Sequence, residues 1–256
     1  MHVVAIHSLT GDKEGLAGAL AAILGVTVFE ALARLRAPGS GPSVVAVFAE
    51  QERAERLAGQ LRTGGFQAAI LSAAEIEAEA GRVDVKKVDL GEQELHIDSR
   101  DGGSLILPYT DIDLVVRGTC ISRSETTETV KSRSLSMGKA LLSGGMMITK
   151  TTKSVREVIT EQREGFFSLY AKEGPPLYFR ENGLFYESLG AALRLSSVAN
   201  FAYLVSEIRR RCPYARYDER LLNRTGQVFL LGPLLSPEKH LVVATGLLSK
   251  VLRERQ

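Results

Sequence analysis

The sequence contains no tryptophan and only two cysteines, and aromatic residues make up 6% of its 256 residues. Cys120 and Cys212 lie far apart and outside any CxxC pattern. This spacing argues against both a disulfide framework and a Cys-rich zinc site, so we expect two reduced thiols in a cytoplasmic protein. The net charge of +2 is too small to attract nucleic acid to the molecule as a whole.

Long apolar runs are also missing. No stretch approaches the roughly 18 apolar residues that a transmembrane helix needs. The segment from Met1 to Ile6 is a short apolar run without a basic flank, which predicts a strand and not a secretion signal. With 45% hydrophobic and 24% charged residues, the composition is ordinary for a soluble globular protein of one large or two small domains.

Catalytic motifs are absent as well. The four histidines are scattered without zinc-ligand spacing, and the sequence has neither a GxSxG elbow nor a GxxxxGK[ST] phosphate loop. Asp111 and Asp113 share one face of a predicted strand, where they could do acid–base work, bind a cation or form the solvent face of an edge strand. We therefore predict no catalytic residues, no metal and no cofactor.

The hydrophobic period changes near residue 75, and this change divides the sequence into two predicted modules. The first, residues 1–75, alternates short apolar runs with amphipathic stretches. Its predicted order is β-α-α-β-α-β, with three helices covering one face of a three-stranded sheet and the other face left partly free. Residues 76–82 are a linker, although Ser72 to Gly81 could also form a short helix. Residues 83–256 form the second, β-rich module.

Helix-capping residues mark the first module. Asp12 is expected to cap one helix, and Thr27 forms a capping box with Glu30 at the start of the next. In that second helix, Phe29, Leu32 and Leu35 are the predicted buried stripe.

A family resemblance accompanies this pattern. The run from Leu24 to Ala31 (LGVTVFEA) and the run from Glu52 to Leu61 (ERAERLAGQL), followed by Gly64-Gly65-Phe66, resemble the C-terminal domain of the ribosomal stalk protein. The protease adaptor ClpS shares that fold. The resemblance covers less than a third of the sequence and implies a ClpS-like sandwich. Both families bind other proteins and perform no chemistry.

The second module consists of short alternating strands from Val83 to Tyr186, then a helix from about Ser197 to Arg211. This order weakly resembles a bacterial pleckstrin-homology-like antiparallel barrel with its closing helix; the alternative is an ordinary α+β meander. Val228 to Leu231 is a further predicted strand. Ser236 and Pro237 begin the C-terminal helix, residues 237–254. The predicted fold class is thus α+β.

An insert, residues 122–160, interrupts the second module. It is rich in Ser, Thr and basic residues and contains no aromatic residue, so it is expected to be a flexible loop. Within it lies a small apolar island that is a candidate docking segment for a protein groove or an anionic membrane. Its members are Leu135, Met137, Leu141, Met146 and Met147. The alternative is a solvated loop that packs loosely on its own domain.

A cluster of arginines follows the predicted helix 197–211 and is interleaved with Tyr214 and Tyr217. Arginine between tyrosines can bind phosphates or stack on RNA bases, whereas arginines also gather at helix C-termini because of the helix dipole. The candidates for anion contact are Arg209, Arg210, Arg211, Arg216 and Arg220.

The absence of a catalytic set, together with the resemblance to protein-docking families, predicts a non-enzymatic, protein-binding adaptor of bacterial type. The expected partner is another protein. The alternative is a peripheral protein that binds anionic lipid or nucleic acid, with a membrane or RNA as partner. The second alternative is an unrecognised enzyme.

Overall fold

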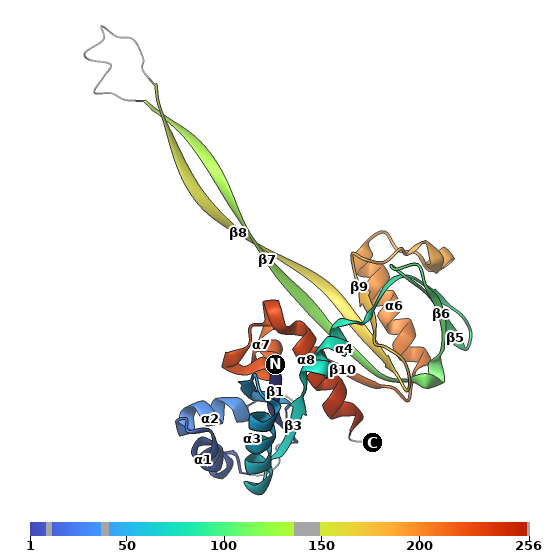
Figure 1. Ribbon diagram of the computed structural model, residues 1–256. Helices are drawn as coiled ribbons and strands as arrows, with labels where there is room; N and C mark the ends of the chain where they lie inside the picture. The colour runs from blue at the N-terminus through green and yellow to red at the C-terminus, as the bar shows by residue number, and fades with distance from the viewer. Residues whose placement is uncertain (9–11, 37–40, 136–148, 255–256) are drawn as a thin grey trace, which may run out of the picture. The chain divides into compact units, whose positions relative to one another are not determined.

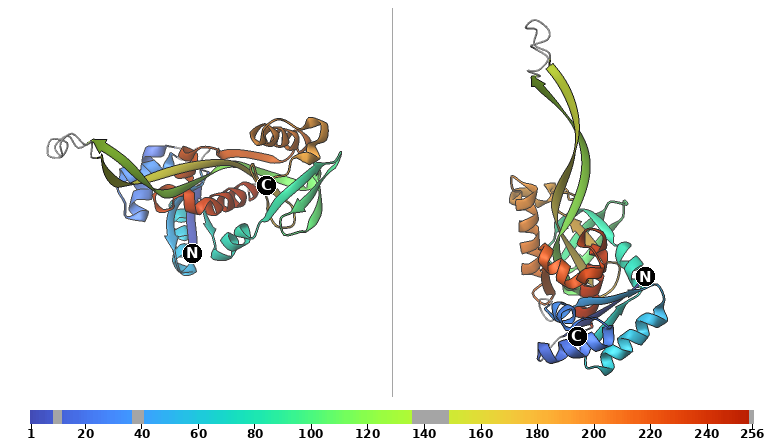
Figure 2. Two further views of the ribbon diagram at one scale, coloured as in Figure 1. Left: turned by 90° about the horizontal axis from the view of Figure 1, so that it is seen from above. Right: turned by 90° about the vertical axis from the view of Figure 1, so that its left-hand side faces the viewer.

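The computed structural model describes residues 1–8, 12–36, 41–135 and 149–254, without the side chains of residues 13 and 122–161. Its contacts separate the protein into two compact units, Met1–Cys120 with Glu164–Gln256, and Ile121–Arg163. The predicted α+β class is confirmed, because helices accompany a three-stranded sheet and a seven-stranded sheet. Figures 1 and 2 show these elements from three directions.

The three-stranded sheet is antiparallel, with the order β2-β1-β3. Its strands are β1 (His2–His7), β2 (Ser43–Phe48) and β3 (Gln67–Leu71). The helices of this region are α1 (Lys13–Leu24), α2 (Val28–Leu35) and α3 (Gln51–Thr63), so the elements follow the predicted β-α-α-β-α-β order. Asp12 caps α1 and Thr27 forms the expected capping box with Glu30.

Alternate residues of β1 face two different cores, because successive side chains in a strand point to opposite faces. Val4 and Ile6 pack with α1, α2 and α3. Val3 and Ala5 belong to a second cluster that includes residues of the last two helices, α7 (Arg224–Leu231) and α8 (Pro237–Arg253). The sheet face expected to be partly free is therefore covered by the C-terminal end of the protein. The segment after β3 forms α4 (Ala73–Ala80), with its own capping box between Ser72 and Glu75.

The larger sheet has the order β10-β7-β8-β9-β4-β5-β6. Its strands are β4 (Val83–Leu90), β5 (Glu94–Ser99), β6 (Ser104–Pro108), β7 (Ile112–Leu135), β8 (Thr149–Ala171), β9 (Leu177–Arg180) and β10 (Arg216–Leu221). β4 runs parallel to β9, and β10 runs parallel to β7. The described strands thus form an open mixed sheet in place of the expected antiparallel barrel. The predicted closing helix is present as α6 (Ser197–Arg211), whose residues Phe201 and Leu204 pack in the core of this sheet.

Two local predictions fail. Val228 to Leu231 lies in helix α7, where Asn223 caps the first turn and Gln227, Leu230 and Leu231 are buried. A four-residue apolar run cannot distinguish a buried strand from a buried helix turn. At Leu184 to Tyr186, where a strand was expected, the described structure has one isolated bridge, between Phe185 and Lys87.

The insert was expected to be a loop, and that prediction is wrong for its described residues. β7 extends to Leu135 and β8 begins at Thr149, and the two are neighbours in the sheet. In the unit Ile121–Arg163 they form the long two-stranded ribbon seen in Figure 1. Its sequence is rich in Thr with interspersed Val and Ile, which favour extended backbone even where little apolar surface is available.

Membrane-spanning potential is low for individual helices. Among the described residues, no one helix combines the length and apolarity required to cross a bilayer. Glu14–Leu24 and Val28–Leu35 meet that requirement only when they are taken together, and a bend of 116° separates them.

Covering β1 on its second face should contribute strongly to stability. Leu247 of α8 is fully buried in the shared cluster, whereas Leu195 is fully exposed. We expect Leu247→Ala to lower the free energy of unfolding by about 2–5 kcal/mol. Leu195→Ala removes the same atoms from an exposed position and should change it by less than about 0.5 kcal/mol. Urea denaturation followed by circular dichroism measures both, and equal effects would contradict this role of α8.

Candidate functional site

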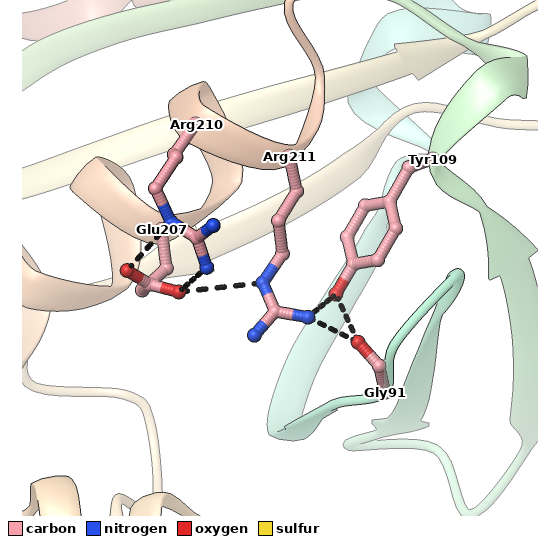
Figure 3. A network of polar contacts seen from close by, with 5 residues as sticks. All are labelled: Gly91, Tyr109, Glu207, Arg210 and Arg211. Carbon is pink, nitrogen blue, oxygen red and sulfur yellow. Dashed lines mark hydrogen bonds and ion pairs between the residues drawn. The ribbon is translucent and has the colours of Figure 1, made fainter.

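The arginines at the end of α6 bind groups within the protein. The Nη2 atom of Arg210 lies 2.7 Å from Oε2 of Glu207, and Nε of Arg211 lies 3.3 Å from the same oxygen (Figure 3). The hydrogen bond from Arg210, supported by Arg211, lowers the pKa of Glu207. Arg211 also donates to the carbonyl of Gly91 and to the hydroxyl of Tyr109, which connects the end of α6 to the neighbouring loops.

The other three candidate arginines lie in different places. Arg209 stacks over the ring of Tyr217, with 4.5 Å between its Cζ and the ring centroid. On β10, Arg216 donates to the carbonyl of Leu252, and Arg220 pairs with Asp218 at 2.7 Å. The structure therefore brings Arg210 and Arg211 together on one carboxylate and distributes the rest. Their contact with an anion stays a prediction.

Other residues singled out from the sequence are also separated. Asp113 pairs with Arg253 at 2.9 Å, and Asp111 lies 3.6 Å from Lys172. In the described part of the protein, no three His, Cys, Asp or Glu residues come together as metal ligands. Both cysteines are free, and burial raises the pKa of Cys212 to about 11, which keeps its thiol protonated.

The candidate docking residues fall mostly beyond what the structure describes. Leu135 is the last residue of β7. The other members, Met137, Leu141, Met146 and Met147, lie outside the described residues.

A groove between α2 and α7 combines apolar walls with the half-buried cation of Arg34. It encloses about 310 Å³ and is lined by Phe29, Glu30, Ala33, Arg34, Ser43, Val228, Phe229, Gly232 and Pro233. Phe29 is 76% exposed and Val228 is 45% exposed, so two large apolar side chains border it. Phe29 was expected in the buried stripe of α2, and that prediction is wrong. The buried residues of α2 are Ala31 and Leu35, at the i, i+4 spacing of one helix face.

The guanidinium of Arg34 is the cationic group that lines this groove. Its Nε and Nη1 atoms are buried, and neither has a hydrogen-bond partner among the described residues. Glu30, one turn earlier, is occupied by the capping box: its Oε2 accepts from the backbone N of Thr27 at 2.9 Å and from the hydroxyl at 2.8 Å. These bonds lower the pKa of Glu30 and fix its position. The guanidinium of Arg34, which lines the groove, thus has two N–H-bearing atoms without an acceptor among the described residues.

A second cavity lies between α4 and α8 and encloses about 300 Å³. At its wall, Glu79 is only 5% exposed, and the hydroxyl of Tyr170 donates to its Oε1 at 2.6 Å. Burial raises the pKa of Glu79, and the nearby hydroxyls of Tyr170 and Thr245 only partly oppose this effect. One turn earlier on α4, burial also acts to raise the pKa of Glu75, but hydrogen bonds from Lys250 and Ser72 lower it overall.

Comparison with known proteins gives no relative for this sequence or fold. No family model, curated protein or solved structure matches it. The groove and the cavity are therefore the features of the protein that bear on its function.

Sequence reasoning missed both places for identifiable reasons. The groove needs α2 and α7, which are almost 200 residues apart, and only the spacing of Ala31 and Leu35 could have indicated that Phe29 points away from the core. Glu79 belongs to an Ala/Glu-rich segment that was interpreted as a linker or short helix. No local signal distinguishes Glu79 from Glu77, because its burial is created by α8 and β8.

The raised pKa of Glu79 predicts how stability depends on pH. The native state holds the proton of Glu79 more tightly than the unfolded state does, so this residue stabilises the fold at low pH and loses that contribution as the pH rises through its native pKa. Glu79→Gln preserves shape and accepts from Tyr170 without titrating. We expect its melting temperature, relative to the wild type, to increase between pH 4.5 and pH 8. A parallel pH profile for the two proteins would contradict this, and Glu77→Gln on the exposed side of α4 is the matched control.

Proposed function

We propose that the protein is a non-enzymatic adaptor that binds another protein in the groove between α2 and α7. The observation that carries this proposal is the groove itself, where the exposed ring of Phe29 lies beside Arg34, whose Nε and Nη1 atoms have no acceptor among the described residues. Exposed aromatic side chains and arginines are the residue types that contribute most to protein–protein binding.

The groove favours a particular kind of segment. Its apolar walls suit a hydrophobic side chain of the partner. A buried N–H group without an acceptor costs about 1–3 kcal/mol, which a partner oxygen placed at Arg34 would recover. A carboxylate does this best, because charge-assisted hydrogen bonds to a guanidinium are stronger than neutral ones. The expected ligand is therefore a peptide segment in which an apolar residue adjoins an acidic residue or the terminal carboxylate of the peptide.

The resemblance of residues 1–75 to the ribosomal stalk domain and to ClpS supports the same function. Helix α2 lies within the run from Leu24 to Ala31 and its continuation, which carry part of that resemblance. Members of both families act by binding other proteins. The pleckstrin-like resemblance covers residues 83–211, none of which lines the groove, so it has no part in this proposal.

The proposal predicts that a partner is captured through the groove. A photoreactive amino acid at Ala33, which lines the groove, should crosslink one defined protein in native lysate. Phe29→Ser and Arg34→Gln should each weaken the binding of that purified partner by about tenfold or more. Leu195→Ser, which removes another exposed apolar side chain, is the control and should bind normally. Unchanged affinity in both groove variants would reject the groove as the docking site.

A second candidate function is the binding of an anionic membrane or RNA by the ribbon. Residues 121–163 contain eight Lys or Arg and four Glu, a net charge of +4, whereas the other residues have 24 basic and 26 acidic side chains, a net charge of −2. Positive charge is therefore concentrated in the unit Ile121–Arg163. Residues near an anionic membrane surface contribute about 1 kcal/mol for each Lys or Arg.

This second candidate predicts binding that weakens steeply as salt is added, because counterions compete for the phosphates. Sedimentation with anionic vesicles and fluorescence anisotropy with a labelled RNA, each between 50 and 300 mM NaCl, would measure it. Replacing Lys150, Lys153 and Arg156 with Ser should lower the binding and its salt dependence together. Absence of binding to both ligands at the lowest salt would eliminate this function.

A further inference from the structure

We propose that the cavity between α4 and α8 binds a small primary ammonium compound, whose cationic group pairs with the carboxylate of Glu79. This site is separate from the groove of α2 and α7 and does not depend on it. The proposal rests on the cavity, on the buried polar groups at its wall and on the lack of an ion-pair partner for one of them among the described residues.

Three elements place buried polar side chains together here. Glu79 of α4 is 5% exposed, Tyr170 of β8 is 3% exposed and Thr245 of α8 is fully buried. Tyr170 donates to Glu79, and Thr245 donates to the carbonyls of its own helix. Gly246 permits this close approach, since a Cβ atom on it would lie 3.2 Å from Cδ2 of Leu71 and 3.6 Å from Cγ of Glu79.

The cations that line the cavity already have anionic partners. The Nζ atom of Lys250 lies 2.6 Å from Oε1 of Glu75 and 2.6 Å from the carbonyl of Ile70. Arg253 pairs with Asp113 at 2.9 Å and donates to the carbonyl of Ala171 at 2.9 Å.

Glu79, in contrast, makes no ion pair with any described residue. Arg82 is the one cation that acts on it, and its attraction is the weakest of the influences that lower the pKa of Glu79. The guanidinium of Arg82 lies instead over the ring of Tyr178, with 3.4 Å between its Cζ and the ring centroid. Glu79 is therefore a buried carboxyl group that accepts a hydrogen bond from Tyr170 but forms no ion pair with a described residue.

A positively charged ligand would supply the counter-ion for Glu79. A buried carboxylate without a counter-ion is costly, and an ammonium group beside it removes that cost. The hydroxyl of Ser249, which donates to Gly246, keeps lone pairs that can accept a second ammonium hydrogen. Leu71, Ala171 and Pro176 provide apolar wall for a short hydrocarbon tail. A free carboxylate or phosphate is disfavoured, because Lys250 and Arg253 are occupied and Glu75 repels it.

Binding should be coupled to a proton. In the free protein, burial favours the neutral acid form of Glu79, whereas the ammonium favours its carboxylate. The ligand therefore enters as a cation, the O–H bond of Glu79 breaks and one proton leaves for the buffer from each neutral acid that is converted. Affinity should rise as the pH rises through the native pKa of Glu79. The titratable and charged groups facing Glu79 across this site are Glu75, Arg82, Tyr170, Lys250, Arg253 and Glu254.

Three probes of similar size distinguish a cationic, an anionic and a neutral ligand: propylammonium, propionate and 1-propanol, each at up to 50 mM and constant ionic strength. We expect propylammonium to raise the melting temperature of the full-length protein by about 2 °C or more, and the other two to have little effect. Calorimetry in two buffers of different ionisation enthalpy should show that protons are released on binding. The increase in melting temperature caused by propylammonium should become larger between pH 5 and pH 8, because more of Glu79 is then already a carboxylate.

Two variants make the test specific. Glu79→Gln keeps the shape of the site but cannot pair with a cation, so it should abolish both the shift and the proton release. Ala78→Leu narrows the cavity without touching the carboxyl group and should weaken binding. Glu77→Gln is the control and should behave as the wild type. A propylammonium shift that persists in Glu79→Gln, a shift with propionate, or no shift in a wild-type protein that folds normally would overturn the proposal.

Discussion

The central strand β1 must be covered on both faces, and the arrangement of the main unit follows from this constraint. Val3, Val4, Ala5 and Ile6 are all fully buried, although they alternate between two sides of a thin, three-stranded sheet. One layer of helices, α1 to α3, can cover only one side. The second side requires another layer, and α7 and α8 supply it from the far end of the sequence. Both candidate sites lie where this second layer meets the first part of the protein.

The helices of the second layer, α7 and α8, contribute differently to the groove and to the cavity. In the groove, α7 contributes apolar wall beside α2, where Phe29 is exposed and the Nε and Nη1 atoms of Arg34 have no acceptor among the described residues. In the cavity, α8 packs on α4 and buries Glu79, which forms no ion pair with any described residue. The groove thus offers hydrogen-bond donors from Arg34, and the cavity offers an acceptor, the carboxyl group of Glu79. Opposite charge preferences at the two sites would let one protein respond to two different ligands.

The sequence predicted features that depend on neighbouring residues and failed on those that depend on distant ones. Asp12, Thr27 and Glu30 act within one helix turn, so the starts of α1 and α2 could be located. The run Val228 to Leu231 is apolar throughout, so its pattern does not distinguish a strand from a helix. The structure has a helix here, whose first turn is capped by Asn223. The ribbon was missed because polar, Thr-rich sequence lacks the burial that identifies ordinary strands. The burial of Glu79 and the exposure of Phe29 are set by α8, β8 and α7, which lie far away in the sequence.

The distance between β3 and α8 has a consequence for synthesis. The first sheet is complete once Leu71 has been made, but its second face meets Leu247 and Leu248 some 175 residues later. At about 5–20 residues per second, a ribosome needs roughly 10–35 s to cover that interval. Throughout it, Val3, Ala5 and Leu71 present an apolar surface that α8 does not yet cover. During this interval the surface can associate with other polypeptides. The module that is synthesised first is therefore the last to have both faces of its sheet covered.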